Sequence, residues 1–339
     1  MNLDQRITAF VKLGQRIATL SNEDFKTLHD KAAQKNPWFT ADNVRIALRG
    51  ISKFLVEDTL RAWTSTEGYS LTPAQPRHVG VAMAGNIPLA GFHDFLSVLI
   101  AGHKLHAKLS SQDSVLISFL SETLQQHEPN FASYISFQER LNGVDAVIAT
   151  GSDNTSRYFE YYFRNIPHII RKNRSSCAVI MGEEDQAQLT SLGRDVFSYF
   201  GLGCRNVSKL FVPEQYSFIP LLDSWEGYKE ISNHHKYANN YDYQKSILLV
   251  NQVPFLDNGF VMLTEHKNLV SPISTLFFEH YKDLPDLYDK LNLHSDKIQC
   301  MTSANSWFKE SVSFGQAQFP EVADYADKVD TLKFLSALP

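Results

Sequence analysis

The sequence VGVAMAGNIP, residues 79–88, joins an apolar run to a Gly-Asn turn and a proline. Residues 79–83 carry no charge, which is typical of a strand that is buried on both faces. An apolar helical pattern follows from Leu89 to Ala101. Pro88 suits the first turn of that helix, because its missing N–H would be unpaired there anyway. The stretch predicts a strand, a tight turn and a helix, the unit from which parallel sheets are built.

The same alternation continues towards the C-terminus, where short apolar runs are separated by helical patterns. It predicts the α/β class, with three α/β/α layers in which helices cover parallel sheets. From residue 3 to about residue 66, apolar residues instead repeat at helical spacing, which predicts a helical N-terminal segment. The runs expected to form strands are 79–83, 105–109, 145–150, 177–181, 209–212, 246–250, 260–264, 274–279 and 297–301.

Composition excludes several classes of protein. The formal net charge is -5 and the pI is about 6.2, so no general affinity for nucleic acid or for an anionic membrane is expected. Three widely spaced cysteines predict neither disulfides nor a structural metal site. Charged residues interrupt the first twenty positions, and no run approaches membrane-spanning length. We therefore expect a cytoplasmic protein without an integral membrane segment.

Three segments place polar side chains after expected strands. Asn86 is either the N-cap of the following helix or an amide donor to an oxyanion beside a cleft. Lys108, Ser110 and Ser111 end the second expected strand; they are either solvated surface residues or hydrogen-bond partners of a cofactor ribose at the carboxyl edge of the sheet. Thr150-Gly151-Ser152 opens a helix around Tyr158 to Phe163, where backbone N–H groups can bind phosphate.

The fourth segment is Gly201-Leu202-Gly203-Cys204, followed by an apolar run at Leu210-Phe211-Val212. Two glycines around Leu202 allow a tight backbone beside the thiol, so Cys204 could be presented to a cleft as a nucleophile. The alternative is a small core residue, as most cysteines in intracellular chains are. Cys177 and Cys300 lie within strand-like runs and are expected to be core residues of that kind.

In this order, the four segments resemble the aldehyde-dehydrogenase superfamily, and specifically the bacterial fatty acyl-CoA reductases associated with luminescence operons. Residues 85–88 resemble the W-N-F-P segment, 108–111 the K-P-S-E segment, 150–152 the T-G-S turn, and 203–204 the G-Q-x-C nucleophile segment, with Leu202 in place of Gln. The resemblance covers roughly residues 78–303. It implies that Cys204 and Asn86 are catalytic and that the cofactor is held by Lys108, Ser110, Ser111, Thr150, Gly151 and Ser152.

Departures from the family pattern narrow the expected reaction. Residues 170–174, Ile-Arg-Lys-Asn-Arg, replace the E-L-G-G-K segment and contain no carboxylate to activate water. Thioester reduction is therefore favoured over aldehyde oxidation to acid. Asn268 falls near the position of a second family Glu that holds the nicotinamide ribose. Ser111 replaces the Glu of K-P-S-E, which permits NADPH, with NADH as the alternative.

The resemblance implies an acyl-CoA reductase that converts a fatty acyl-CoA to an aldehyde through a Cys204 acyl-enzyme. Two alternatives stay open: a CoA-acylating aldehyde dehydrogenase working in the reverse direction, and a non-catalytic acyl-binding subunit. A homo-oligomer or an acyl-transferring partner enzyme is expected. The expected divisions are 1–64 for a helical segment packed on the cofactor domain, 65–174 for that domain, 175–308 for the catalytic domain, and 309–339 for a segment that packs back or joins an oligomer interface.

Overall fold

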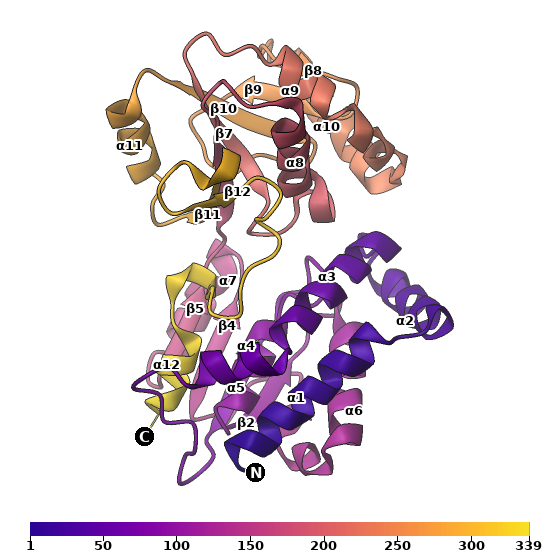
Figure 1. Ribbon diagram of the computed structural model, residues 1–339, viewed down its shortest axis with the longest axis vertical. Helices are drawn as coiled ribbons and strands as arrows, with labels where there is room; N and C mark the ends of the chain where they lie inside the picture. The colour runs from indigo at the N-terminus through magenta and orange to yellow at the C-terminus, as the bar shows by residue number, and fades with distance from the viewer. Residues whose placement is uncertain (339) are drawn as a thin grey trace. The chain divides into compact units, whose positions relative to one another are not determined.

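The computed structural model describes the backbone of residues 1–338 and every side chain in that range except that of Asp153. The chain forms two compact units. The first comprises Met1–Asn173 together with the chain from Pro320 onward, and the second is Arg174–Phe319. Figure 1 shows the C-terminal segment, in yellow, returning to the unit that holds the N-terminus. The first unit is thus assembled from both ends of the chain.

A parallel five-stranded sheet forms the centre of the first unit, in the order β3-β2-β1-β4-β5. Its strands are β1 (His78–Ala82), β2 (Lys104–Lys108), β3 (Ile135–Phe137), β4 (Ala146–Thr150) and β5 (His168–Arg171). Its helices are α1 (Leu3–Ala18), α2 (Asn22–Lys35), α3 (Ala41–Phe54), α4 (Glu57–Thr64), α5 (Phe92–Ile100), α6 (Ser114–His127), α7 (Asp153–Phe163) and α12 (Thr331–Ser336).

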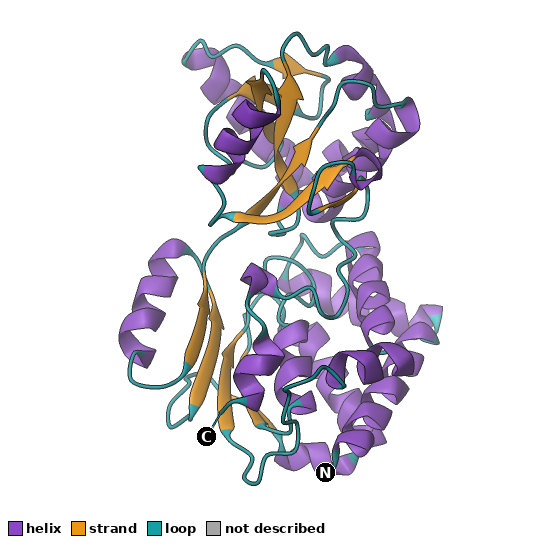
Figure 2. Cartoon of the chain, turned by 60° about the vertical axis from the view of Figure 1, so that its left-hand side comes forward, coloured by secondary structure: helices purple, strands orange, loops and turns teal. Residues whose placement is uncertain are grey.

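Two cores separate the layers of this unit. The larger one joins α1–α6 and α12 to one face of the sheet. On the opposite face, Phe159 and Phe163 of α7 pack on Val147 and Ala149 of β4. Figure 2 shows a single helix on one side of these strands and the remaining helices on the other. The predicted α/β class and the helical N-terminal segment are confirmed.

The second unit contains a seven-stranded sheet in the order β12-β11-β6-β7-β10-β9-β8, parallel except for β8. Its strands are β6 (Ser175–Val179), β7 (Val207–Pro213), β8 (Leu256–Asp257), β9 (Met262–Glu265), β10 (Thr275–Tyr281), β11 (Ile298–Ser303) and β12 (Ser311–Ser313). Helices α8 (Gln186–Phe197) and α9 (Ile219–Ser224) pack on one face and α11 (Leu284–Asn292) on the other; α10 is His235–Val250.

The structure corrects one predicted strand. Residues 246–250 end helix α10, in which Tyr237 is the one buried residue. No Gly or Pro interrupts the chain from His235 to Val250, so the helix continues through the apolar run. Leu249 is 59% exposed and Val250 is 82% exposed, whereas a central strand would be covered on both faces. A short apolar run alone does not distinguish a helix from a strand.

No helix among residues 1–338 combines the length and the apolar character that crossing a membrane requires.

Candidate active site

The segments predicted to bind a cofactor follow three neighbouring strands of the first sheet. Asn86 follows β1, Ser110 and Ser111 follow β2, and residues 151–152 follow β4. Because these strands are parallel, their carboxyl ends meet at one edge of the sheet. The chain runs from β1 outward to β3 and then returns to place β4 beside β1 on the other side. This reversal point is where ligands of such sheets gather.

The turn after β1 is longer than predicted. Helix α5 begins at Phe92 with Gly91 as its N-cap, so Asn86 is not the cap and Pro88 lies before the first turn. Leu89 interrupts the expected helix because its φ is +61°. The backbone N–H of Leu89 donates to Asp113 Oδ2 at 2.6 Å, which holds this left-handed residue in place. Asn86 is therefore presented on an exposed loop and not at a helix end.

The loops after β1 and β2 lie against each other. A Cβ atom on Gly85 would stand 2.4 Å from Ser110 Oγ, so only glycine permits this approach. The amide of Asn36, which is buried, donates to the Gly85 carbonyl at 3.2 Å. Lys108 and Ser111 are exposed at the same edge, and Ser110 is half-buried. The structure thus brings Asn86 and the Lys108–Ser111 segment together at one edge of the sheet.

The turn after β4 forms the start of helix α7. Ser152 is its N-cap, and the Ser152 hydroxyl accepts a hydrogen bond from the Thr155 N–H at 3.3 Å. A Cβ atom on Gly151 would stand 3.0 Å from Thr155 Cβ, so a side chain there would crowd the first turn. The positive end of the helix dipole and the first N–H groups face the edge that carries Asn86. These features suit a phosphate group.

Asp113 holds the turn after β1 in place through its hydrogen bond with Leu89, and this role was not predicted from the sequence. It is 3% exposed, and its Oδ1 atom has no hydrogen-bond partner among the described residues. Burial raises the pKa of Asp113 from 3.8 to about 7, although the Leu89 N–H favours the ionised form.

Stability should respond to this carboxyl group. Because the folded protein holds the proton that the unfolded chain releases, we expect stability to fall as the pH rises from about 4 to about 7. The upper bound on this loss is roughly 4 kcal/mol. Asp113→Asn should reduce the slope of stability against pH by the contribution of this one residue, as measured by urea unfolding across the pH range. Asp58→Asn, which changes an exposed residue in α4, should leave it unchanged; equal slopes for wild type and Asp113→Asn would contradict the assignment.

Cys204 lies on the loop that leads into β7, in the second unit. It is exposed, whereas Cys177 and Cys300 are buried as expected. Burial raises the pKa of the Cys177 thiol, which keeps it protonated and unreactive. Cys204 is therefore the cysteine that a ligand in solution can reach.

The backbone just before Cys204 has an unusual, left-handed conformation. Three consecutive residues, Tyr199, Phe200 and Gly201, have φ values of 52°, 58° and 77°. Left-handed backbone at residues with large side chains is strained and often marks a functional site. Asn206 holds the loop in this shape: its Oδ1 accepts from the Gly203 N–H at 2.8 Å, and its Nδ2 donates to the Asp195 and Ser198 carbonyls at 3.0 and 2.7 Å.

Two charged residues join this loop to residues 315–317. The guanidinium of Arg205 donates to the Ala317 carbonyl and, at 3.6 Å, to Cys300 Sγ. The carboxylate of Asp195, which is fully buried, accepts from the N–H groups of Gly315 and Ala317 at 2.6 and 3.0 Å. Burial raises the pKa of Asp195 to about 7. Residues far apart in the sequence thus fix the loop that carries Cys204.

A small pocket lies beside the Cys204 loop within the second unit. Phe200 and Gly201 line it from the loop, and Ser271–Thr275 lines it from the chain that leads into β10. The other lining residues are Val196, Phe197, Val207, Ser208, Tyr237 and Val261. The lining is thus a mixture of apolar side chains and hydroxyl groups.

The remaining predicted features can now be placed. Asn86 and the six candidate cofactor-binding residues belong to the first unit, and Cys204 belongs to the second. Asn268 is exposed on the loop between β9 and β10. Among the described residues, no group of three or more His, Cys, Asp and Glu side chains could hold a metal ion.

No protein-family model matches the sequence, and no curated protein is similar to it in sequence. Solved structures are similar in fold. The NAD+ complex of an aldehyde dehydrogenase from Bacillus cereus aligns with a TM-score of 0.65 at 11% identity, over 91% of this chain and 73% of that one. An aldehyde dehydrogenase from Mycobacterium tuberculosis complexed with NAD+ aligns with a TM-score of 0.64 at 13% identity, over 89% and 73%.

An NADP-dependent enzyme from E. coli gives a TM-score of 0.65 at 12% identity, over 89% of this chain and 73% of that one. Identities of this size establish the fold alone. The two sheets of this chain, parallel except for β8, and the helices that cover them have the fold of the aldehyde dehydrogenases.

Proposed function

We propose that the chain is an acyl-CoA reductase, which converts an acyl-CoA thioester to an aldehyde with NADPH through an acyl-enzyme on Cys204. The observation that carries the proposal is the exposure of Cys204 on a strained, tightly anchored loop, while the other two cysteines are buried. Residues 65–174 would bind the cofactor and residues 175–308 would carry the nucleophile.

Residues 170–174 support reduction over hydrolysis. They contain no carboxylate, and Arg171 is buried in an ion pair with Asp94 at 2.5 Å. An acyl-enzyme without a general base to activate water is hydrolysed slowly, so it persists long enough to be reduced.

The carboxyl edge of the first sheet fits a nicotinamide dinucleotide. The start of α7 at Ser152 offers N–H groups to a phosphate, and Lys108 supplies a positive charge at the same edge. Ser110 and Ser111 supply hydroxyls for a ribose. Since Ser111 leaves no negative charge at its position, a 2′-phosphate is accepted there, which favours NADPH over NADH. When bound, the cofactor supplies the hydride that reduces the acyl group.

The protein side chains perform the remaining steps. The Cys204 thiolate attacks the acyl carbonyl, and the Cys204 N–H stabilises the oxyanion. The family resemblance implies that the Asn86 amide would be a second donor. One such donor typically contributes about 3 kcal/mol in the transition state. Collapse of the tetrahedral intermediate breaks the bond to the coenzyme A sulfur. After reduction, the thiohemiacetal on Cys204 releases the aldehyde and regenerates the thiol.

Incubation with acyl-CoAs of graded chain length and NADPH tests the proposal. We expect equal amounts of aldehyde, free CoA and NADP+, and a trapped Cys204 acyl-enzyme when the cofactor is omitted. Faster turnover of aldehyde with CoA and NADP+ would instead identify a CoA-acylating dehydrogenase. A stable acyl-enzyme that yields no aldehyde with NADPH or NADH would identify a non-catalytic acyl-binding subunit, and no acylation at all would refute the proposal.

A further inference from the structure

We infer that Ser208 and Lys209 are positioning residues, which fasten the segment 266–269 to the start of β7 and thereby fix the chain that follows it, residues 271–275, as one wall of the pocket beside the Cys204 loop. The inference rests on the proposed function for its catalytic consequence. The claim that side chains hold the four backbone carbonyls of residues 266–269 can be tested without measuring enzymatic turnover.

All four consecutive carbonyls of residues 266–269 accept hydrogen bonds from side chains. Lys209 Nζ donates to the His266 carbonyl and, at 3.4 Å, to the Asn268 carbonyl. Ser208 Oγ donates to the Leu269 carbonyl at 2.8 Å. His294 Nε2 lies 3.1 Å from the Lys267 carbonyl. A loop is usually solvated along its backbone, so capture of every carbonyl in a row indicates a segment held in one conformation.

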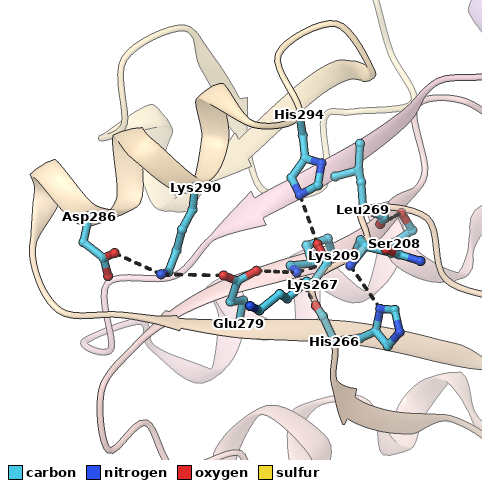
Figure 3. Close-up of polar contacts among 10 residues, drawn as sticks. Ser208, Lys209, His266, Lys267, Leu269, Glu279, Asp286, Lys290 and His294 are labelled. Carbon is cyan, nitrogen blue, oxygen red and sulfur yellow. Dashed lines mark hydrogen bonds and ion pairs between the residues drawn. The ribbon is translucent and has the colours of Figure 1, made fainter.

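Burial of the Lys209 ammonium group at this position costs free energy. Its side chain is 0% exposed, and burial lowers the pKa of its ammonium group. The Glu279 carboxylate compensates for the burial by accepting from Lys209 Nζ at 2.8 Å. Figure 3 shows the array continuing from Glu279 to Lys290 and Asp286 of α11. A buried ion pair contributes little to stability against an apolar alternative, so the ammonium is best explained by the carbonyls that it orders.

Serine hydroxyls connect this segment to Cys204. Ser208 Oγ, which holds Leu269, lies 2.7 Å from Ser175 Oγ. The next residue, Ser176, donates from its hydroxyl to the Cys204 carbonyl at 3.0 Å. Because β7 and β10 are parallel neighbours, the Cys204 loop before β7 and residues 271–275 at the start of β10 reach the same edge of the sheet, where both line one pocket. The first residues of β7 therefore set the spacing between the two.

The side chains of the segment face outward as a result. With the carbonyls turned towards β7, His266, Lys267 and Asn268 are exposed. The carbonyls hold the segment in place, and the chain that continues from it forms the pocket wall at residues 271–275. Fixing such a wall matters because a displacement of about 1 Å can slow a reaction by about 100-fold.

Lys209→Met tests the inference, since it keeps the length of the side chain and removes the ammonium. We expect amide hydrogen exchange in residues 266–275 to accelerate at least about tenfold. Alkylation of Cys204 by iodoacetamide should accelerate about threefold as the wall loosens. In the reductase assay kcat should fall about tenfold, with KM for acyl-CoA changed less than about twofold. Lys229→Met, which breaks an exposed ion pair with Glu226 in the same unit, is the matched control.

Milder variants keep the test independent of folding. Ser208→Ala removes the link to Leu269, and His294→Ala removes the link to Lys267 from a half-buried position. Each should accelerate exchange at its own end of the segment. If hydrogen exchange were unchanged in all three variants, these side chains would not hold the segment 266–269 in one conformation. Faster exchange with unchanged alkylation and unchanged kcat would refute the positioning role. Alkylation and exchange report on the array even if the protein reduces no acyl-CoA, so the two proposals fail separately.

Discussion

Cys204→Ala is expected to abolish acyl-enzyme formation and to lower the rate of aldehyde production by at least about 1000-fold. Removal of a covalent nucleophile has effects of this size or larger, because no other group can take over the step. The thiol is exposed and its loop is anchored through the backbone and through Asn206, so the variant should fold normally. Radiolabelled acyl-CoA measures the first effect, and the aldehyde assay measures the second.

Cys177→Ala is the matched control. Cys177 is 0% exposed within β6, and its replacement should lower stability slightly while leaving acylation intact. Label that remains on the Cys204→Ala protein would assign the nucleophile to another residue. Such a result would leave the fold unaffected and remove the basis of the proposed reaction.

Arg171→Met should lower the free energy of unfolding by about 3–5 kcal/mol, because it leaves the buried Asp94 carboxylate without its cation. The side chains of Arg171 and Asp94 are only 6% and 8% exposed, and their ion pair spans 2.5 Å. Arg171 also donates to the Thr331 hydroxyl at 2.8 Å, so the substitution detaches the C-terminal segment from β5. Urea unfolding, together with hydrogen exchange of β5 and α12, measures both effects.

A second substitution separates charge from packing. Arg171→Met combined with Asp94→Leu removes both charges from the core, and we expect it to regain most of the lost stability. If Arg171→Met alone were as stable as the wild type, the ion pair would have no structural importance. In that case Arg171 would have to be reconsidered as a residue of the site.

Much of the sheet architecture could be predicted because buried parallel strands form continuous apolar runs. Eight of the nine expected strands correspond to observed ones, displaced by at most two or three residues. The four edge strands, β3, β5, β8 and β12, are short and were not predicted. Two further features escaped prediction for physical reasons. Residues 246–250 have the composition of a buried strand but continue an existing helix. The left-handed turn at Leu89 depends on Asp113, which is 24 residues away in the sequence.

The residues of the candidate site also divide into those that the sequence suggested and those that it did not. Its exposed residues could be found because they follow strands and lie in short local patterns, as Asn86, Ser152 and Cys204 do. The buried residues that hold these exposed residues in place could not be predicted. Asp113 and Lys209 are buried polar residues whose partners lie 24 and 70 residues away in the sequence, and Asn206 bonds to a loop whose left-handed shape has no sequence pattern. A buried polar side chain becomes recognisable only when its hydrogen bonds are known.

The return of the C-terminus has a consequence for how the protein is made. Thr331 bonds to Arg171, and the Leu335 carbonyl receives a hydrogen bond at 2.9 Å from His103. A ribosome synthesises these residues after residues 1–319, so the first unit stays incomplete while the second unit is translated. Arg174–Phe319, being one unbroken stretch, can finish first. The order of completion in the cell would then be the reverse of the order of synthesis.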